Sequence, residues 1–243
     1  MQELLLKLKD RFKREKISVG LDIGTSAIKI VKLRFLNDGI QLYSFHLEPI
    51  QGALNELLKT IARNQELNKV NISVSGPAAI IRYVDFPKMK EEELRKALKY
   101  EAQKYIPFSS SEVNLDGYIL KQDLADNKML VLLAAAKKDF INQRLQLIQD
   151  SGIRVNMIGI DSLALVNAFN FNYSEEGNLK NKTIALLNIG ASTSNLNILE
   201  NGIPRLTRDI QIAGNNFSQK IAENLGIDFK SAEQLKLKAD NAR

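Results

Sequence analysis

The feature that most constrains the fold is a segment that occurs twice, once in each half of the chain. Each copy reads as a β-strand, a short turn containing glycine and a second β-strand. The first copy spans residues 17–33 and the second spans residues 185–196. Two folds of one kind, each presenting a polar glycine turn, is the economical interpretation. The matching positions, all at one offset, are Asp22 and Asn188, Gly24 and Gly190, and Ser26 and Ser192.

The residues of the first turn suit a phosphate group. Gly24 lets a ligand approach the main chain, and Thr25 and Ser26 add hydroxyl donors beside backbone N–H groups. Asp22 can hold a magnesium ion through water, and Lys29 can reach back over the turn as a point charge. An ordinary hairpin with a glycine turn is the alternative. The repetition favours phosphate, because two such turns facing each other can grip a polyphosphate from both sides.

Composition excludes several classes of chemistry. The chain has 243 residues, no cysteine and a single histidine, so disulfides, thiolate zinc sites, cysteine nucleophiles and histidine-rich metal clusters are absent. His46 lies in a strand-like segment, which argues against a Ser-His-Asp triad. No apolar run approaches the length of a membrane span and no signal peptide is present, so we expect a cytoplasmic protein.

The net charge of +6 is concentrated at the N-terminus. Residues 1–16 contain six basic and three acidic side chains, a balance of +3, so the rest of the chain is close to neutral. This distribution argues against nucleic-acid binding. Residues 1–16 also predict a short basic amphipathic helix. It either contacts an anionic membrane surface or a membrane-bound partner, or it is a mobile or packed leader. Its apolar face consists of Leu4, Leu5, Leu8 and Phe12.

The sequence pattern changes at residue 78, where a compact α+β unit begins. This unit contains a strand over residues 79–86, a charged helix over residues 90–105 and a strongly apolar strand over residues 129–136. The polar run over residues 170–182 reads as a loop that links two halves. We therefore predict a first lobe from residues 17–77 and 153–172, an inserted subdomain from residues 78–152, and a second lobe from residues 183–243.

Several of these segments resemble the actin-like ATPases. The stretch from Asp22 to Lys29 resembles their first phosphate loop, and residues 188–194 resemble the second. Residues 158–165, with Asp161, resemble the connecting helix, and residues 213–215 and 232–236 resemble the stretches that hold the nucleoside. The insertion, with its Pro107-Phe108 pair, resembles the subdomain inserted in FtsA and PilM. Taken together, the chain resembles the PilM family of type IV pilus assembly proteins.

The resemblance implies an α/β fold of the two-lobed actin-like and ribonuclease H-like kind, binding ATP with magnesium. It implies a partner, the cytoplasmic tail of a PilN-like inner-membrane protein, together with other pilus platform proteins, at the inner face of the inner membrane. The residues implied for the phosphates, the metal and the nucleoside are Asp22, Gly24, Thr25, Ser26, Lys29, Asn188, Gly190, Ala191, Ser192, Thr193, Gly214, Asn215, Glu233 and Lys236. The candidates for the partner groove are Tyr105, Ile106, Pro107 and Phe108, and subdomain core is the alternative for Tyr105 and Phe108.

Two departures from the family pattern limit the prediction. Asn188 replaces the usual aspartate, which keeps an acceptor oxygen but loses the charge that a magnesium-bound water favours, so it argues against hydrolysis more than against binding. The Gly-rich loop under the adenine is also missing, so we expect a truncated second lobe.

Two other functions remain open at this point. An active ATPase or a sugar or acetate kinase would need a catalytic carboxylate, for which Asp161 is the candidate, although a role as a helix cap explains this residue better. An FtsA-like division protein is the other alternative. FtsA carries its membrane helix at the C-terminus, whereas the amphipathic segment here is N-terminal.

Overall fold

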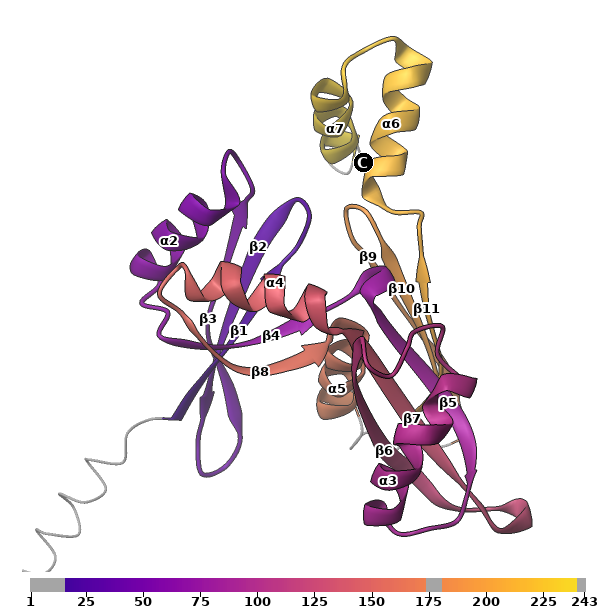
Figure 1. Cartoon of the computed structure of the whole chain (residues 1–243). Helices are drawn as coiled ribbons and strands as arrows, with labels where there is room; N and C mark the ends of the chain where they lie inside the picture. The colour runs from indigo at the N-terminus through magenta and orange to yellow at the C-terminus, as the bar shows by residue number, and fades with distance from the viewer. Residues whose placement is uncertain (1–15, 174–180, 240–243) are drawn as a thin grey trace, which may run out of the picture. The chain divides into compact units, whose positions relative to one another are not determined.

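The computed structural model describes residues 16–173 and 181–239, which form three β-sheets and the helices around them (Figure 1). Contacts within the chain divide it into two compact units. Unit 1 comprises residues 1–72 and 146–158, and unit 2 comprises residues 73–145 and 159–243.

Unit 1 is built on a five-stranded mixed sheet with the order β3-β2-β1-β4-β8. β1 pairs with β2 in the antiparallel sense and with β4 in the parallel sense. A parallel pair needs a crossover connection, which helix α2 (Leu54–Asn64) supplies between β3 and β4. The strands are β1 (Lys16–Ile23), β2 (Ala27–Phe35), β3 (Ile40–Pro49), β4 (Lys69–Val74) and β8 (Arg154–Ile160).

The core of unit 1 lies between this sheet and α2. Leu21, Ile28 and Ile30 are buried on one face of β1 and β2, and α2 adds Leu58 and Ile61 to the same cluster. Successive side chains of a strand point to opposite faces. The alternation that buries these residues therefore places the side chains next to them in sequence, at positions 22 and 29, on the outer face.

The first part of unit 2 is a three-stranded antiparallel sheet with the order β5-β7-β6. Its central strand is a continuous apolar run, which suits a strand covered on both faces. Helix α3 (Glu91–Glu101) packs on one face through Leu94 and Leu98. Gly117 on β6 permits this approach, because a Cβ there would lie 2.3 Å from Leu98 Cδ1. The strands are β5 (Ala79–Pro87), β6 (Val113–Leu124) and β7 (Lys128–Lys137), and helix α4 (Lys138–Gln149) follows.

The second part of unit 2 is another three-stranded antiparallel sheet, with the order β11-β10-β9. A pair of helices in contact, α6 and α7, follows its last strand. The elements are α5 (Asp161–Tyr173), β9 (Thr183–Ile189), β10 (Ser194–Glu200), β11 (Ile203–Ile210), α6 (Gly214–Leu225) and α7 (Phe229–Lys238).

The two sheets of unit 2 meet along their edge strands, β5 and β11. Tyr83 on β5 and Thr207 on β11 are joined by a hydrogen bond of 2.7 Å between their hydroxyl oxygens. Thr207 in turn donates to Asn197 Oδ1 at 2.9 Å, so the Tyr83 hydroxyl is the donor in the first bond. Burial raises the pKa of the Tyr83 hydroxyl.

Two predicted element boundaries are wrong. Residues 170–173 were expected in a loop, but α5 continues to Tyr173, where the rings of Phe169 and Tyr173 lie 5.0 Å apart between centroids. Such a contact between residues four apart supports the last helical turn. The charged helix predicted over residues 90–105 ends at Glu101 and is followed by a 3-10 turn at Ala102–Lys104.

The predicted leader helix, residues 1–16, lies outside the described residues except for Lys16, which begins β1. The predicted division into lobes and an inserted subdomain remains a prediction. Within the two described ranges, no helix is both long and apolar enough to cross a membrane.

Candidate functional site

The first glycine turn, in unit 1, joins β1 to β2. Gly24 N donates to Ala27 O at 3.1 Å, and a Cβ on Gly24 would lie 2.9 Å from that oxygen, so the turn needs glycine. Asp22 and Lys29 are register partners, and Lys29 Nζ lies 2.9 Å from Asp22 Oδ2. The residue predicted for the metal and the one predicted for phosphate thus form an ion pair. The hydroxyl-bearing residues between them, Thr25 and Ser26, are exposed.

The second glycine turn, in unit 2, joins β9 to β10 and has the same backbone hydrogen bond. Gly190 N donates to Thr193 O at 3.2 Å, and a Cβ on Gly190 would lie 2.7 Å from that oxygen. Ser192 is exposed at the turn, and Ala191 is partly buried beside it. The repeat seen in the sequence is therefore also a repeat of local structure.

The second turn is tied to the start of α6 by two backbone hydrogen bonds. Gly214 N donates to Gly190 O at 2.9 Å, and Asn215 N donates to Ala191 O at 2.8 Å. A Cβ on Gly214 would lie 3.2 Å from Gly190 O, so a side chain there would crowd the turn. The structure thus brings together four of the residues predicted for the phosphates and the nucleoside.

Glu233 and Lys236, also predicted for the nucleoside, lie on α7 and contact α6. Lys236 Nζ donates to Glu233 Oε2 at 2.6 Å and to Gly214 O at 3.1 Å, and the buried Ser218 hydroxyl donates to the same carboxylate. The hydrogen bond from Lys236, and then that from Ser218, lower the pKa of the Glu233 carboxyl. Sequence reasoning missed Ser218, and its spacing of one helical turn from Gly214 is the only signal that could have found it.

A row of polar side chains crosses the sheet at the end nearest the second turn. Asn188 on β9, Asn195 on β10 and Asp209 on β11 are successive register partners. Asn188 Nδ2 donates to Asn195 Oδ1 at 3.3 Å, and Asn195 Nδ2 donates to Asp209 Oδ1 at 2.5 Å. Sequence reasoning identified Asn188 alone, because strand pairing and not a motif brings the other two beside it.

The chemistry of these donors fits a nucleotide with a hydrated magnesium ion better than a directly bound metal. Within residues 16–173 and 181–239, no group of three or more His, Cys, Asp or Glu side chains could hold a metal ion. The exposed carboxylate of Asp22 suits contact through water, and tight turns of glycine and hydroxyl-bearing residues are of a kind that suits an anion.

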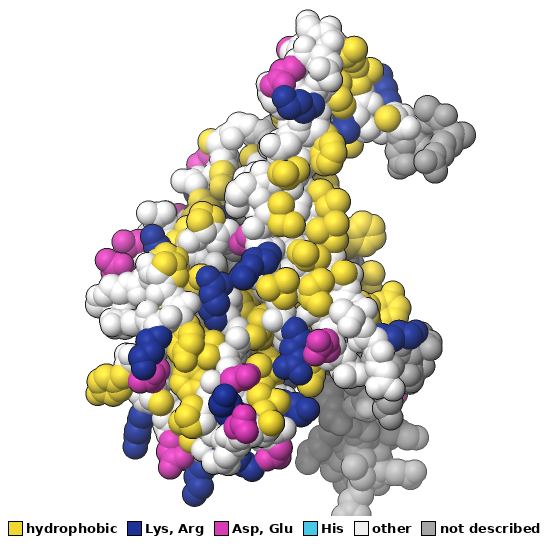
Figure 2. Space-filling view, turned by 90° about the vertical axis from the view of Figure 1, so that its right-hand side faces the viewer, with side chains coloured by type: hydrophobic (Ala, Val, Ile, Leu, Met, Phe, Trp, Pro, Cys, Tyr) yellow, Lys and Arg dark blue, Asp and Glu magenta, His cyan; other side chains and the backbone are white. Residues whose placement is uncertain are grey.

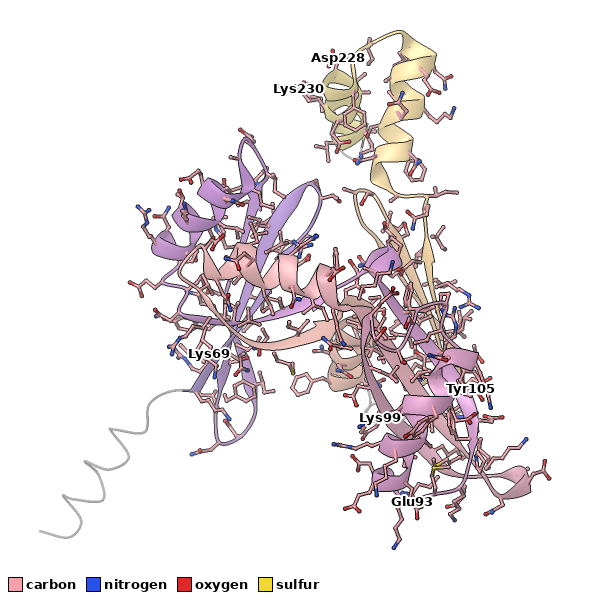
Figure 3. All side chains as sticks on the ribbon, in the orientation of Figure 1. Lys69, Glu93, Lys99, Tyr105, Asp228 and Lys230 are labelled. Carbon is pink, nitrogen blue, oxygen red and sulfur yellow. The ribbon has the colours of Figure 1, made fainter. Side chains whose placement is uncertain are left out.

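The four residues proposed for a partner groove lie partly in the core of unit 2 and partly along a groove. Ile106 is buried in the core beside α3, and Tyr105 packs against Phe86 with ring centroids 5.7 Å apart. Figure 3 shows Tyr105 in the same part of unit 2 as Lys99 of α3. Pro107 and Phe108 line a groove of about 330 Å³ in unit 2, and Phe108 also packs against the same core cluster as Tyr105. Lys137 Nζ lies 4.9 Å from the centre of the Phe108 ring.

This groove runs between the two edge strands, β5 and β11. Its walls are residues 79–82 of β5 and 207–209 of β11, and its ends include residues 75–77 and the start of α5. Arg82 and Arg208 supply cationic groups, and burial followed by the charge of Arg208 lowers the pKa of Arg82. Figure 2 shows Lys and Arg side chains set among hydrophobic ones on the side of the molecule that carries these strands.

Asp161, the catalytic candidate, begins α5 and lines the same groove. Its Oδ1 accepts from Ser162 N at 2.6 Å. This contact agrees with the alternative that Asp161 supports the start of its helix. Asp161 therefore belongs to the groove of unit 2 and not to the second glycine turn.

A family model described as type IV pilus assembly protein PilM matches residues 20–242. Cell division protein FtsA of Bacillus subtilis (strain 168) is 22% identical over 266 residues, covering 93% of this chain. The chain spans 59% of the length of that relative.

Solved structures share the fold. A PilM-PilN type IV pilus biogenesis complex matches with a TM-score of 0.80 and 24% identity, covering 91% of this chain and 69% of the other. The cytoplasmic domain of EpsL, an inner-membrane component of the type II secretion system of Vibrio cholerae, matches with a TM-score of 0.54 and 10% identity, covering 88% and 76%. The actin-like α/β fold predicted from the sequence is confirmed.

Proposed function

Because the chain belongs to the PilM family of type IV pilus assembly proteins, we propose that it is a nucleotide-binding assembly component that captures a membrane protein's tail. The tail is the short cytoplasmic segment of a PilN-like inner-membrane protein. The observation that carries this proposal is the groove between the edge strands β5 and β11.

The groove suits an extended peptide. β5 and β11 are each the edge strand of their sheet among the described residues, and an edge strand offers main-chain groups to an added strand. Phe108 and Pro107 provide apolar contact for side chains of the peptide, and Arg82 and Arg208 provide donors for its carbonyl or carboxylate oxygens. The TM-score of 0.80 to a structure solved as a PilM-PilN complex supports the same choice of partner.

The test is binding of a synthetic peptide with the tail sequence of a PilN-like protein to the 243-residue chain, measured by calorimetry. Phe108→Ala should weaken binding about tenfold or more, as removal of a buried aromatic anchor does. Phe45→Ala is the matched control, because Phe45 is exposed on β3 in unit 1. Absence of binding by the intact, folded chain would remove the proposed function.

We also propose that the chain binds ATP with magnesium through its glycine turns. Asp22, Lys29 and the hydroxyls of the first turn would meet the phosphates and the hydrated ion, as would residues 188–193 of the second turn. Gly214, Asn215, Glu233 and Lys236 would approach the nucleoside. Magnesium, when bound, supplies charge that offsets the phosphates. The support is the shared backbone geometry of the two turns, in which a Cβ at Gly24 or Gly190 would come within 3 Å of a carbonyl oxygen.

The proposed location follows from the proposed partner. A protein that holds the cytoplasmic tail of an inner-membrane protein works in the cytoplasm at the inner face of that membrane, beside other proteins of the pilus platform. Residues 1–16 are proposed as a further contact with the anionic membrane surface.

A further inference from the structure

The side chains of Asn188, Asn195 and Asp209 form the polar row in unit 2. The hydrogen bonds along this row all run in one direction, from Asn188 toward Asp209. Its central residue, Asn195, is only 3% exposed, so its amide has little access to water. An ionised carboxylate can only accept hydrogen bonds. Asn195 therefore turns Nδ2 toward Asp209, at 2.5 Å, and its Oδ1 toward the other neighbour in the row.

The same reasoning applies to the next residue. Since Asn195 offers an oxygen, Asn188 meets it with Nδ2, at 3.3 Å. The exposed Asn188 side chain then keeps its Oδ1 for other partners. The carboxylate of Asp209 on β11 thus determines which atom of the Asn188 amide on β9, Oδ1 or Nδ2, stays available beside the glycine turn.

The corresponding row in unit 1 shows why the orientation of the Asn188 amide matters for the second turn. The register row at the same place there consists of Asp22, Lys29 and Leu47, so a carboxylate stands directly beside the first turn. In unit 2 the position of Asp22 is taken by a neutral amide, which can donate as well as accept. Water bound to a magnesium ion needs acceptors.

We propose that Asp209 is a positioning residue for the second glycine turn. Acting through Asn195, it holds the Asn188 amide with its carbonyl oxygen outward, so that a neutral residue presents only an acceptor to a cation-bound water. This inference rests on the proposed binding of ATP with magnesium.

The first experiment uses the unliganded chain. In a 15N-labelled sample, Asp209→Asn should move the side-chain amide resonances of Asn188 although Asn195 lies between the two positions. The control Asp85→Asn, at an exposed position of β5 outside the groove wall, should leave them in place. Unchanged Asn188 resonances in Asp209→Asn would overturn the proposal, whether or not the chain binds a nucleotide.

The second experiment measures ATP affinity with and without magnesium. Asp209→Asn should reduce the gain in affinity that magnesium confers about tenfold, the size expected for loss of one hydrogen bond to a charged group, and leave magnesium-free affinity unchanged. Adding Asn188→Asp to that variant should restore the gain, because a carboxylate accepts in either orientation. Failure of this rescue, with both variants folded, contradicts the positioning role. Absence of ATP binding by the wild-type chain contradicts the proposed function instead, and the amide resonances then decide the orientation alone.

Discussion

Lys29 and Asp22 face each other across β1 and β2, with Nζ 2.9 Å from Oδ2. Both side chains are about half exposed, at 53% and 51%. An exposed pair of this kind contributes about 0–1 kcal/mol to stability, so a polyphosphate can compete with it at little cost. A ligand can therefore break this ion pair and contact both the ammonium group and the carboxylate of the proposed site.

Replacing Lys29 should affect binding far more than stability. Lys29→Gln is expected to weaken ATP binding about tenfold, through loss of one charge-assisted contact, and to change the free energy of unfolding by less than about 1 kcal/mol. Calorimetry and urea unfolding measure the two effects. Lys69→Gln, at an exposed position at the start of β4 in unit 1, is the matched control (Figure 3). An equal loss of affinity in the control would show that only general charge is involved.

Adding a methyl group at Gly117 should disturb the β5-β7-β6 sheet. The new Cβ would lie 2.3 Å from Leu98 Cδ1, so α3 or the Leu98 side chain must shift, and we expect a loss of about 1–3 kcal/mol. When Leu98 is already replaced by alanine, adding Gly117→Ala should cost less stability than it costs in the wild-type chain. Gly159→Ala is the control, since nothing lies within 4 Å of the Cβ it would add. Urea unfolding in which the two glycine variants behave alike would refute the close packing.

The parts of the site that local sequence specifies could be predicted, and those that strand pairing specifies could not. Alternation around Leu21 and the repeated glycines at 24 and 190 identify both turns, because a hairpin is a local structure. Asn195 and Asp209 carry no such signal, since only the register of β9, β10 and β11 places them beside Asn188.

The run from Tyr105 to Phe108 shows a second limit. Its residues adjoin in sequence and were proposed for one groove, yet Ile106 is buried beside α3 and Tyr105 packs on Phe86. Pro107 lines the groove, and Phe108 both lines it and packs on the core. The turn that ends α3 decides which side chains face inward. An irregular turn has no period that a sequence pattern could reveal.

Acid should weaken the contact between α6 and α7. The pKa of Glu233 is lower in the folded chain than its unfolded value of about 4.3, so its contribution is complete above that value and is lost as pH falls through the folded pKa. Glu233→Gln should cost about 0.5–1 kcal/mol near neutral pH, a discounted figure because a third of the side chain is exposed, and the difference from wild type should shrink in acid.

Urea unfolding at a series of pH values measures this convergence. Glu92→Gln on α3, outside the two helices, is the control and should differ little from wild type at neutral pH. A Glu233→Gln variant whose deficit stays constant down to low pH would mean that the carboxylate does not stabilise the helix pair.

Whether the chain hydrolyses ATP is expected to depend on Asn188. Phosphoryl transfer depends on a positioned metal ion and on charge around the phosphates. The second turn offers a neutral amide there, and its nearest carboxylate in the row, Asp209, already accepts from Asn195. We therefore expect phosphate release by the wild-type chain no faster than the background without protein. Asn188→Asp returns a negative charge to this turn and should raise both the affinity for magnesium and the rate of release, measured by a phosphate-binding assay. Clear turnover by the wild-type chain that Asn188→Asp does not increase would show that another group supplies the charge.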